Sequence, residues 1–174
     1  VHEAVVYRLF RAMGVPAPRI GYVRVYVNGV DYGLHLNVET YDDVMLKRWF
    51  ASTQHLYEGA YWQDIVDGQY QAMQTDEGDL NNRDDLAALA LVNNTKDGKD
   101  WFDAVQQYLD LDEFVREMAV ERVIGHWDGY AWTIKNNYYA HSTAEGVFSI
   151  LPWGTDQTLN GWVDLFGAGD VGIM

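Results

Sequence analysis

The residues best suited to chemistry lie in the C-terminal third of the chain, where two acidic turns flank a pair of asparagines. Asp128 precedes a glycine in the first turn, Asn136 and Asn137 open a predicted strand, and Asp156 lies in the second turn. Magnesium-dependent phosphoryl transfer uses these residue types, because one carboxylate orients the attacking hydroxyl while an amide oxygen and a second carboxylate hold the metal against the phosphates. The segment therefore indicates metal-assisted phosphate chemistry.

The same residues also fit an ordinary structural interpretation. Asp-Gly is a common turn pair, and most loop aspartates only accept hydrogen bonds from nearby backbone donors. One of the two asparagines would then cap the turn while the other begins the strand. Enough residues separate Asp128 from Asp156 for a hairpin to bring both carboxylates to one cleft. Local pattern alone leaves both interpretations open.

Several other chemistries find little support in the sequence. The five histidines are scattered, no pair has the i, i+4 spacing of a helical zinc site, and there is no cysteine. There is no G-x-S-x-G motif, and neither a Walker A loop nor the glycine-rich loop of protein kinases occurs. Asp128 and Asp156 could act as the carboxylate pair of a glycosidase, with some of the 7 Trp and 12 Tyr stacking on sugars. Core packing and strand propensity explain the aromatic residues equally well.

The composition limits the class of partner. The chain has 174 residues and 48% hydrophobic content, which predicts one domain or two closely packed small lobes. Its 12 basic and 26 acidic residues give a formal charge of −14 without a basic stripe, which argues against nucleic acid. An acidic surface favours cationic partners, although it can serve solubility alone. No apolar run reaches the roughly 18 residues of a membrane-spanning helix. The first residue is Val1, and we expect an excerpt of a longer protein.

The N-terminal third predicts a helix followed by a hairpin. Apolar residues at helical spacing run through residues 1–14, and two prolines then enforce an extended exit. Residues 19–39 alternate with a period of two around an Asn-Gly turn, which predicts an antiparallel hairpin with one buried and one more polar side. A helix is expected over 41–51 with Asp42 or Asp43 at its start.

The remainder of the chain predicts mostly helices and a final hairpin. A short strand is expected over 55–62, and the polar, glycine-dotted stretch 64–82 is interpreted as a loop with room for one helical turn. Three helical patterns follow, centred on Leu86–Val92, Trp101–Leu109 and Leu111–Ile124. The last has an apolar stripe that predicts its buried face, formed by Leu111, Phe114, Val115, Met118 and Ala119. Two short strands, 137–141 and 146–151, then complete the pattern.

Four sequence stretches in order resemble the spore-coat protein H (CotH) kinase family and span nearly the whole chain. They are LFRAMGVPAPRIGYVRVYVNGVDYGLHLNVE, DLDEFVREMAVERVIGHWDGY, NNYYAH and VFSILPWGTDQT. The resemblance implies an atypical, secretory-kinase-like fold that moves the γ-phosphate of ATP to Ser or Thr of a protein with Mg or Mn. It also implies a secreted, cell-surface or spore-coat location and a basic, Ser-rich protein substrate.

The same resemblance implies roles for individual residues. Asp128 corresponds to the catalytic carboxylate, while Asn137 and Asp156 correspond to the metal ligands. Glu39, at the end of the first hairpin, resembles an acidic residue near the junction of the lobes with a role in nucleotide binding. The chain departs from the family pattern at Gly154, where the family commonly has the first Asp of PWDxD. It also lacks the upstream strands expected to hold a basic residue for the ATP phosphates.

We therefore expect an α+β, protein-kinase-like fold of the atypical CotH type. Residues 1–174 would form a single domain fragment, with a partial N-terminal lobe of helix and hairpin over 1–60 and a mainly helical C-terminal lobe with a terminal hairpin over 61–174. The leading hypothesis is an ATP- and metal-dependent protein Ser/Thr kinase. The alternative is a non-catalytic kinase-like module that supports assembly of a spore coat or cell surface.

Overall fold

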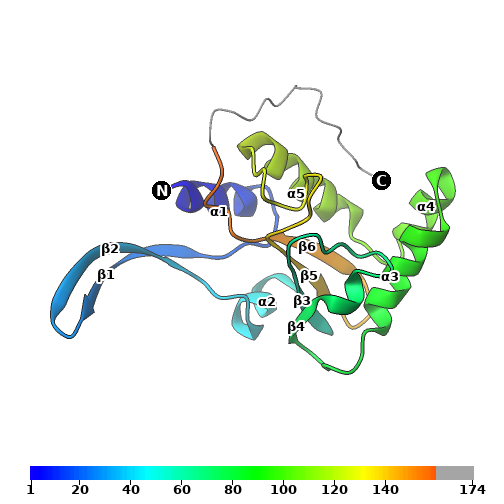
Figure 1. The fold of residues 1–174 in the computed structure, drawn as a ribbon, viewed down its shortest axis with the longest axis horizontal. Helices are drawn as coiled ribbons and strands as arrows, with labels where there is room; N and C mark the ends of the chain where they lie inside the picture. The colour runs from blue at the N-terminus through cyan, green and yellow to red at the C-terminus, as the bar shows by residue number, and fades with distance from the viewer. Residues whose placement is uncertain (160–174) are drawn as a thin grey trace.

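The computed structural model describes residues 1–159 and has the expected α+β class (Figure 1). Helices and strands alternate irregularly along the chain, and the strands form two separate antiparallel sheets. The helices are α1 (His2–Ala12), α2 (Asp43–Trp49), α3 (Asp84–Thr95), α4 (Gly98–Val105) and α5 (Leu111–Ile124), with a 3₁₀ turn at Tyr70–Ala72. The strands are β1 (Ile20–Val27), β2 (Val30–Val38), β3 (His55–Gly59), β4 (Gln74–Glu77), β5 (Tyr138–Ser142) and β6 (Phe148–Pro152).

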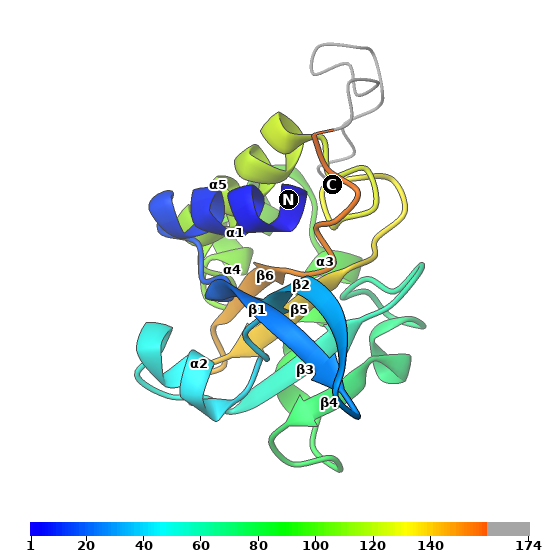
Figure 2. The same ribbon diagram turned by 90° about the vertical axis from the view of Figure 1, so that its left-hand side faces the viewer.

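The larger sheet has the strand order β4-β3-β5-β6 and is covered on both faces (Figure 2). Side chains of successive strand residues point to opposite faces, so Tyr138 packs into one cluster and Tyr139 into another. The first cluster joins the sheet to α3 and α4 through residues such as Leu89 and Val105. The second joins the opposite face to α2 through Met45 and its neighbours. Burial on both sides fixes the register of β5 and β6.

A buried carboxylate ties α3 to this sheet. Asp85, in the first turn of α3, accepts hydrogen bonds from Tyr57 Oη at 2.7 Å and Ser142 Oγ at 2.5 Å, and it pairs with His55 Nδ1 at 2.8 Å. These three partners lie on β3 and β5. Because every oxygen of this buried group is used, the network is structural and holds the start of α3 against two strands.

Helix α1 packs on α5, away from the helices α3 and α4. Val6 and Phe10 of α1 are buried against Val120 and Ile124 of α5. The start of α1 lies close to the residues that follow β6. The charge of Asp156 acts on Glu3, in the first turn of α1, which indicates this proximity. Helices α1 and α5 therefore enclose the chain segment that leaves β6.

The β1–β2 hairpin forms as predicted, but the expected buried side is wrong. The two strands pair from Ile20–Val38 to Val27–Val30 and extend from the rest of the molecule as a ribbon (Figure 1). Only the base residues Ile20 and Val38 pack against the α1–α5 cluster, whereas Leu34 is 70% exposed. Alternation of apolar side chains predicts a strand, but it cannot say whether another element within residues 1–159 covers it.

The buried face predicted for α5 is wrong in part, since Leu111 and Phe114 pack against the core but the stripe as a whole does not face it. Val115, a member of the predicted apolar stripe, is 62% exposed, while Glu113, Glu117 and Glu121 are buried. These glutamates are spaced four residues apart and so share one helical face. That face is buried because β6 and the loop after α5 lie against it, as Glu113 and Glu121 accept hydrogen bonds from Ile150 and Ala131.

The remaining predicted elements are confirmed with small shifts of their ends, apart from one omission. Asp42 caps α2 by accepting hydrogen bonds from two backbone amides of the first turn. The stretch expected to be a loop over 64–82 contains β4, a polar edge strand that pairs with β3. Strand β3 precedes the predicted lobe boundary at residue 60 and pairs with β5, which follows it. The glycine-rich end after Gly161 lies outside the described residues.

Among the helices within residues 1–159, none combines the length and the apolar character required to cross a membrane.

Candidate functional site

The structure brings Asp128 and the two asparagines into direct contact. Helix α5 ends at Gly125, whose left-handed φ of 63° turns the chain into the loop that carries Asp128. Asn136 Nδ2 donates to Asp128 Oδ1, and Asn137 Nδ2 donates to Asp128 Oδ2, each at 2.9 Å. Asn137 Nδ2 also donates to the backbone carbonyl of Asp128 at 2.9 Å. The half-buried carboxylate is therefore oriented by two amides.

Asn137 itself is fixed at the start of β5. Its φ of 47° lies in the left-handed region, which asparagine tolerates better than most residues. Its carbonyl accepts a hydrogen bond from Trp153 N at 3.0 Å, at the end of β6. The ends of the β5–β6 hairpin thus hold the amide that contacts Asp128.

Gly154 lies directly against the Asn137 side chain. A Cβ atom at position 154 would lie 2.8 Å from Asn137 Cγ and 2.9 Å from Asn137 Oδ1, which is closer than real side chains approach. Gly154 also has a φ of 52°. The Asn137 amide therefore occupies the space that an aspartate at 154, as in the family pattern, would need for its first side-chain atom.

Glu121 of α5 holds the loop that carries Asp128. Its Oε2 accepts a hydrogen bond from Ala131 N at 2.6 Å, and its Oε1 pairs with His126 Nδ1 at 2.9 Å. Gly129 passes so close that a Cβ there would lie 2.4 Å from Glu121 Oε1. One buried carboxylate therefore contacts the loop on both sides of Asp128. Sequence reasoning missed it, because a glutamate within an amphipathic helix is usually solvated.

His126 is buried beside this carboxylate. Burial disfavours its charged form, but the hydrogen bond and charge of Glu121 outweigh burial, so the pKa of His126 is raised. The nearby charge of Asp128 acts in the same direction. Glu121 and His126 therefore form a buried, hydrogen-bonded pair within the supporting structure of the site.

Two further carboxyls of α5 are buried in the same row. Burial raises the pKa of Glu113 to about 8. Burial, followed by the charges of Glu121 and Glu113, raises the pKa of Glu117 well above its usual value, and neither Glu117 oxygen has a hydrogen-bond partner within residues 1–159. Lys135, whose charge lowers the pKa of Glu117, donates to Trp132 O at 3.2 Å. Lys135 immediately precedes Asn136 in the chain. It is a cation beside the candidate site that sequence reasoning also missed.

Asp156 lies beyond Gly154, on the side of α1. The Asp156 side chain is exposed. The pKa of Glu3 is raised first by the burial of Glu3 itself and second by the charge of Asp156. Its segment is held by a hydrogen bond of 2.7 Å from Leu159 N to Ile124 O. Two residues of extended chain span at most about 7 Å, so the Cα atom of Asp156 lies within that distance of the Cα atom of Gly154, which is next to the Asn137 side chain. Within residues 1–159, no hydrogen bond joins Asp156 to Asp128.

Glu39 lies apart from these residues, at the end of β2. Its Oε1 accepts from Arg19 Nε at 3.0 Å and Nη2 at 2.8 Å, and its Oε2 pairs with Arg48. Burial opposes ionisation of Glu39, but these hydrogen bonds and the arginine charges prevail and lower its pKa. Glu39 therefore links the base of the hairpin to α2.

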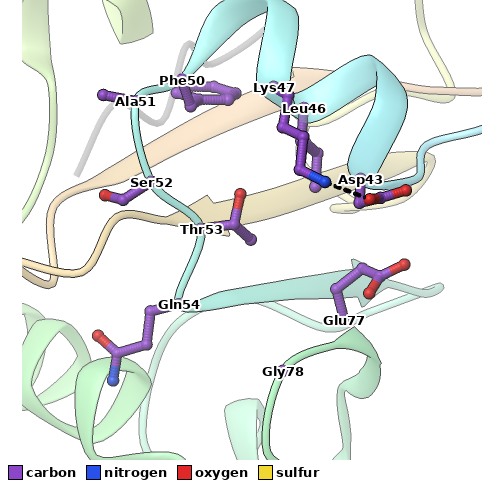
Figure 3. Close-up of a pocket in the computed structure, with 10 residues that line it drawn as sticks. All are labelled: Asp43, Leu46, Lys47, Phe50, Ala51, Ser52, Thr53, Gln54, Glu77 and Gly78. Carbon is purple, nitrogen blue, oxygen red and sulfur yellow. Dashed lines mark hydrogen bonds and ion pairs between the residues drawn. The ribbon is translucent and has the colours of Figure 1, made fainter.

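A pocket of about 310 Å³ lies between α2 and the β3–β4 edge (Figure 3). Lys47, Thr53 and Glu77 are among the side chains that line it, and Lys47 pairs with Asp43 at its rim (Figure 3). Asp128, Asn137, Asp156 and Glu39 are not among the lining residues. The pocket is therefore separate from the site predicted by the sequence.

The site has oxygen donors suited to a hard cation. Over residues 1–159, no three His, Cys, Asp or Glu side chains converge in a manner suited to a metal. Asn137 Oδ1, however, accepts no hydrogen bond from the described residues, and Asp156 is exposed nearby. One amide oxygen and one carboxylate, completed by water and phosphate oxygens, is a donor set that Mg²⁺ or Mn²⁺ accepts. The residues present thus fit such an ion.

Comparison with known proteins defines the class to which this fold and site belong. The model of the family described as CotH kinase protein matches residues 1–172, and the chain belongs to this family. A curated relative is the Inner spore coat protein H of Bacillus subtilis (strain 168), which is 22% identical over 170 residues. The match covers 86% of this chain and 43% of the relative, so the chain spans less than half the relative's length.

Proposed function

We propose that the protein containing this chain is a CotH-type kinase that transfers the γ-phosphate of ATP to Ser or Thr of a protein, with Mg²⁺ or Mn²⁺. The observation that carries the proposal is the contact between Asp128 and Asn137 in a chain of this family. It joins a carboxylate suited to orienting a hydroxyl with an amide oxygen suited to a metal ion.

Asp128 would act on the acceptor hydroxyl. Its two oxygens each accept one amide hydrogen bond, which leaves lone pairs to accept the hydroxyl proton and to aim the oxygen at the phosphate. The asparagine amides fix the carboxylate before the acceptor binds, so orientation needs little rearrangement. Glu121, which pairs with the buried His126 and accepts a hydrogen bond from Ala131 N, holds the loop that carries Asp128 in place.

Asn137 and Asp156 would hold the divalent ion. When bound, the ion neutralises phosphate charge and aligns the transferred group. Asn137 would present Oδ1 while its Nδ2 remains on Asp128, and Asp156 would supply the carboxylate that Gly154 cannot. In this proposal Glu39 contributes to nucleotide binding indirectly, by orienting Arg19 and Arg48.

The net charge of the chain supports the proposed substrate, and its similarity to a spore coat protein supports the proposed location. The chain has a net charge of −14, which favours association with a basic, Ser-rich segment of a protein. Kinship with an inner spore coat protein supports action at a spore coat, and a secreted or cell-surface location is the related alternative.

The test measures phosphate transfer from labelled ATP to a basic Ser-rich peptide, with the full-length parent protein. Asp128→Ala and Asp156→Ala should each lower the rate by about 100-fold or more. Asp103→Ala provides a matched control, because Asp103 is exposed on α4 and, among residues 1–159, pairs with Lys99 alone. Wild-type transfer by either site variant would remove the role assigned to that residue.

A second candidate function is a non-catalytic assembly module of a spore coat or cell surface. Gly154 favours it, because this chain lacks the side chain that the family commonly has beside Asn137. A thermal shift with ATP and Mg²⁺ or Mn²⁺ separates the two functions, since a ligand that binds the folded state raises the melting temperature. Absence of a shift with each nucleotide tested, together with absence of transfer, would favour the assembly module.

A further inference from the structure

A group of arginines surrounds Glu39 where α1, β1 and α2 meet. Arg19, just before β1, and Arg48, in the last turn of α2, pair with Glu39 from either side. Arg11, in the last turn of α1, donates to Pro18 O, which precedes Arg19 in the chain. Arg8 lies one helical turn before Arg11 on the same side of α1. We call these four residues the arginine cluster.

Three of these positive charges act on the fourth, Arg11. Burial, and then the charges of Arg8 and Arg48, lower the pKa of Arg11, while Glu39 opposes them. The charge of Arg19 adds to the lowering. Like charges in mutual range destabilise the group unless an anion compensates them, and one carboxylate compensates only one of four.

The arginine cluster has a net positive charge, whereas the chain as a whole has a net negative charge. Four guanidinium groups and one carboxylate give 4 − 1 = +3 at this place, in a chain whose formal charge is −14. The acidic residues that follow in sequence are already engaged. Asp42 caps α2 through two backbone amides, and Asp43 pairs with Lys47.

We propose that the arginine cluster is a binding site for a phosphate-bearing anion. Guanidinium forks match phosphate oxygens in bidentate geometry, and Arg remains charged under all physiological conditions. The side chains of Arg19 and Arg48 are 62% and 29% exposed, so an anion can reach them. Glu39 holds both in place, which lowers the ordering cost of binding.

The cluster differs in chemistry from the Asp128 site. The proposed kinase site needs a divalent ion, because its carboxylates Asp128 and Asp156 repel phosphate. The arginine cluster has excess positive charge and would bind phosphate without a metal. The inference rests on the nucleotide-binding role proposed for Glu39 and its arginines, and binding measured without a metal tests it separately from phosphoryl transfer.

The experiment measures binding of inorganic pyrophosphate to the full chain by calorimetry, with a chelator present to remove divalent ions. One saturable site is expected, with an affinity that falls as salt rises. The double variant Arg8→Gln, Arg11→Gln should weaken binding by about tenfold or more. It leaves the bridge of Arg19, Glu39 and Arg48 intact.

Arg24→Gln provides the matched control. Arg24 is exposed on the β1–β2 hairpin, where it pairs with Asp31, and its substitution changes the net charge by one unit without touching the cluster. Pyrophosphate affinity should be unchanged in this control. Arg8→Gln alone should give a smaller loss, and it guards against misfolding of the double variant because Arg8 is exposed on α1.

ATP under the same conditions identifies the source of the phosphate group. Tighter binding of ATP than of pyrophosphate indicates a nucleotide ligand, whereas equal affinity indicates recognition of the phosphates alone. The proposal is overturned if pyrophosphate shows no saturable binding to the wild type. It is also overturned if Arg24→Gln weakens binding as much as the double variant does.

Discussion

The side-chain amide of Asn137 donates to Asp128 twice, to carboxylate Oδ2 and to the backbone carbonyl, at 2.9 Å in each case. Because a short loop and a strand start are joined in this way, the orientation of the carboxylate depends on the amide. Asn136 makes the matching contact to Oδ1. The candidate site is thus a preorganised carboxylate rather than a flexible turn residue.

Replacing Asn137 by glycine tests this dependence. Glycine accepts the φ of 47° without strain but removes both hydrogen bonds to Asp128. We expect the rate of phosphate transfer by the parent protein to fall by about 100-fold, because misplacement of a catalytic group by about 1 Å has that effect. Asn28→Gly is the control, since Asn28 has a φ of 50° in the exposed hairpin turn. Equal rates for the two variants would contradict the role of the amide.

Replacing Glu121 separates charge from shape in the support of the loop. Glu121→Gln retains an oxygen for Ala131 N and an amide that can donate to neutral His126, whereas Glu121→Ala removes both contacts. We expect Glu121→Ala to lower the free energy of unfolding by about 3 to 5 kcal/mol, because it leaves buried polar groups unpaired. Hydrogen exchange should show faster exchange of the Ala131 amide in Glu121→Ala than in Glu121→Gln. Equal protection in the two variants would show that Glu121 does not hold the loop.

Glu113 makes stability depend on pH in a defined direction. Burial raises its pKa to about 8 from the 4.5 of an unperturbed glutamate, so the folded state retains a proton that the unfolded state releases. The contribution is complete below about pH 4.5 and is lost as pH rises towards 8, at up to about 1.4 kcal/mol per pH unit. Glu113→Gln, which resembles the protonated acid, should flatten this decline and stabilise the fold at pH 7.

Urea unfolding at pH 5 and at pH 8 measures the effect of Glu113. Glu145→Gln is the control, because Glu145 is exposed in the turn between β5 and β6. The free energy of unfolding should differ less between the two pH values in Glu113→Gln than in the control. The same decline in both variants would place the pH dependence elsewhere.

The sequence was a better guide to the contacts of Asp128 than to their support. The family resemblance grouped Asp128 and Asn137 in one site, and the nine positions between them in sequence allow a single loop to bring them into contact. Glu121 and Glu113 could not be assigned in this way. Their burial depends on a loop and a strand that fold back onto α5 from later in the chain, and helical periodicity alone favoured the exposed Val115.

The hairpin and β4 show the same limit for the fold. Period-two alternation predicted both strands of the hairpin, yet Leu34 is exposed because burial depends on a neighbour and not on the strand's own pattern. Strand β4 lacks such alternation, since Gln74–Glu77 is polar throughout and forms by pairing with β3 at a sheet edge.

Gly154 gives the sharpest test of how the site departs from its family pattern. Gly154→Ala should lower the free energy of unfolding by more than Gly146→Ala does. Both glycines have positive φ, 52° and 77°, so both substitutions incur backbone strain of about 1 to 2 kcal/mol. Only position 154 adds a Cβ that meets Asn137, at 2.8 Å from its Cγ, whereas the space around Gly146 is open.

The same comparison extends to the aspartate of the family pattern. Because the first side-chain atom at position 154 displaces the Asn137 amide, Gly154→Asp should weaken the hold on Asp128 and fail to increase metal affinity. Calorimetry with Mn²⁺ on the wild type, Gly154→Asp and Gly146→Asp measures this directly. A rise in Mn²⁺ affinity of tenfold or more that is specific to Gly154→Asp would show instead that Asn137 can move aside, and that the site lacks only that carboxylate.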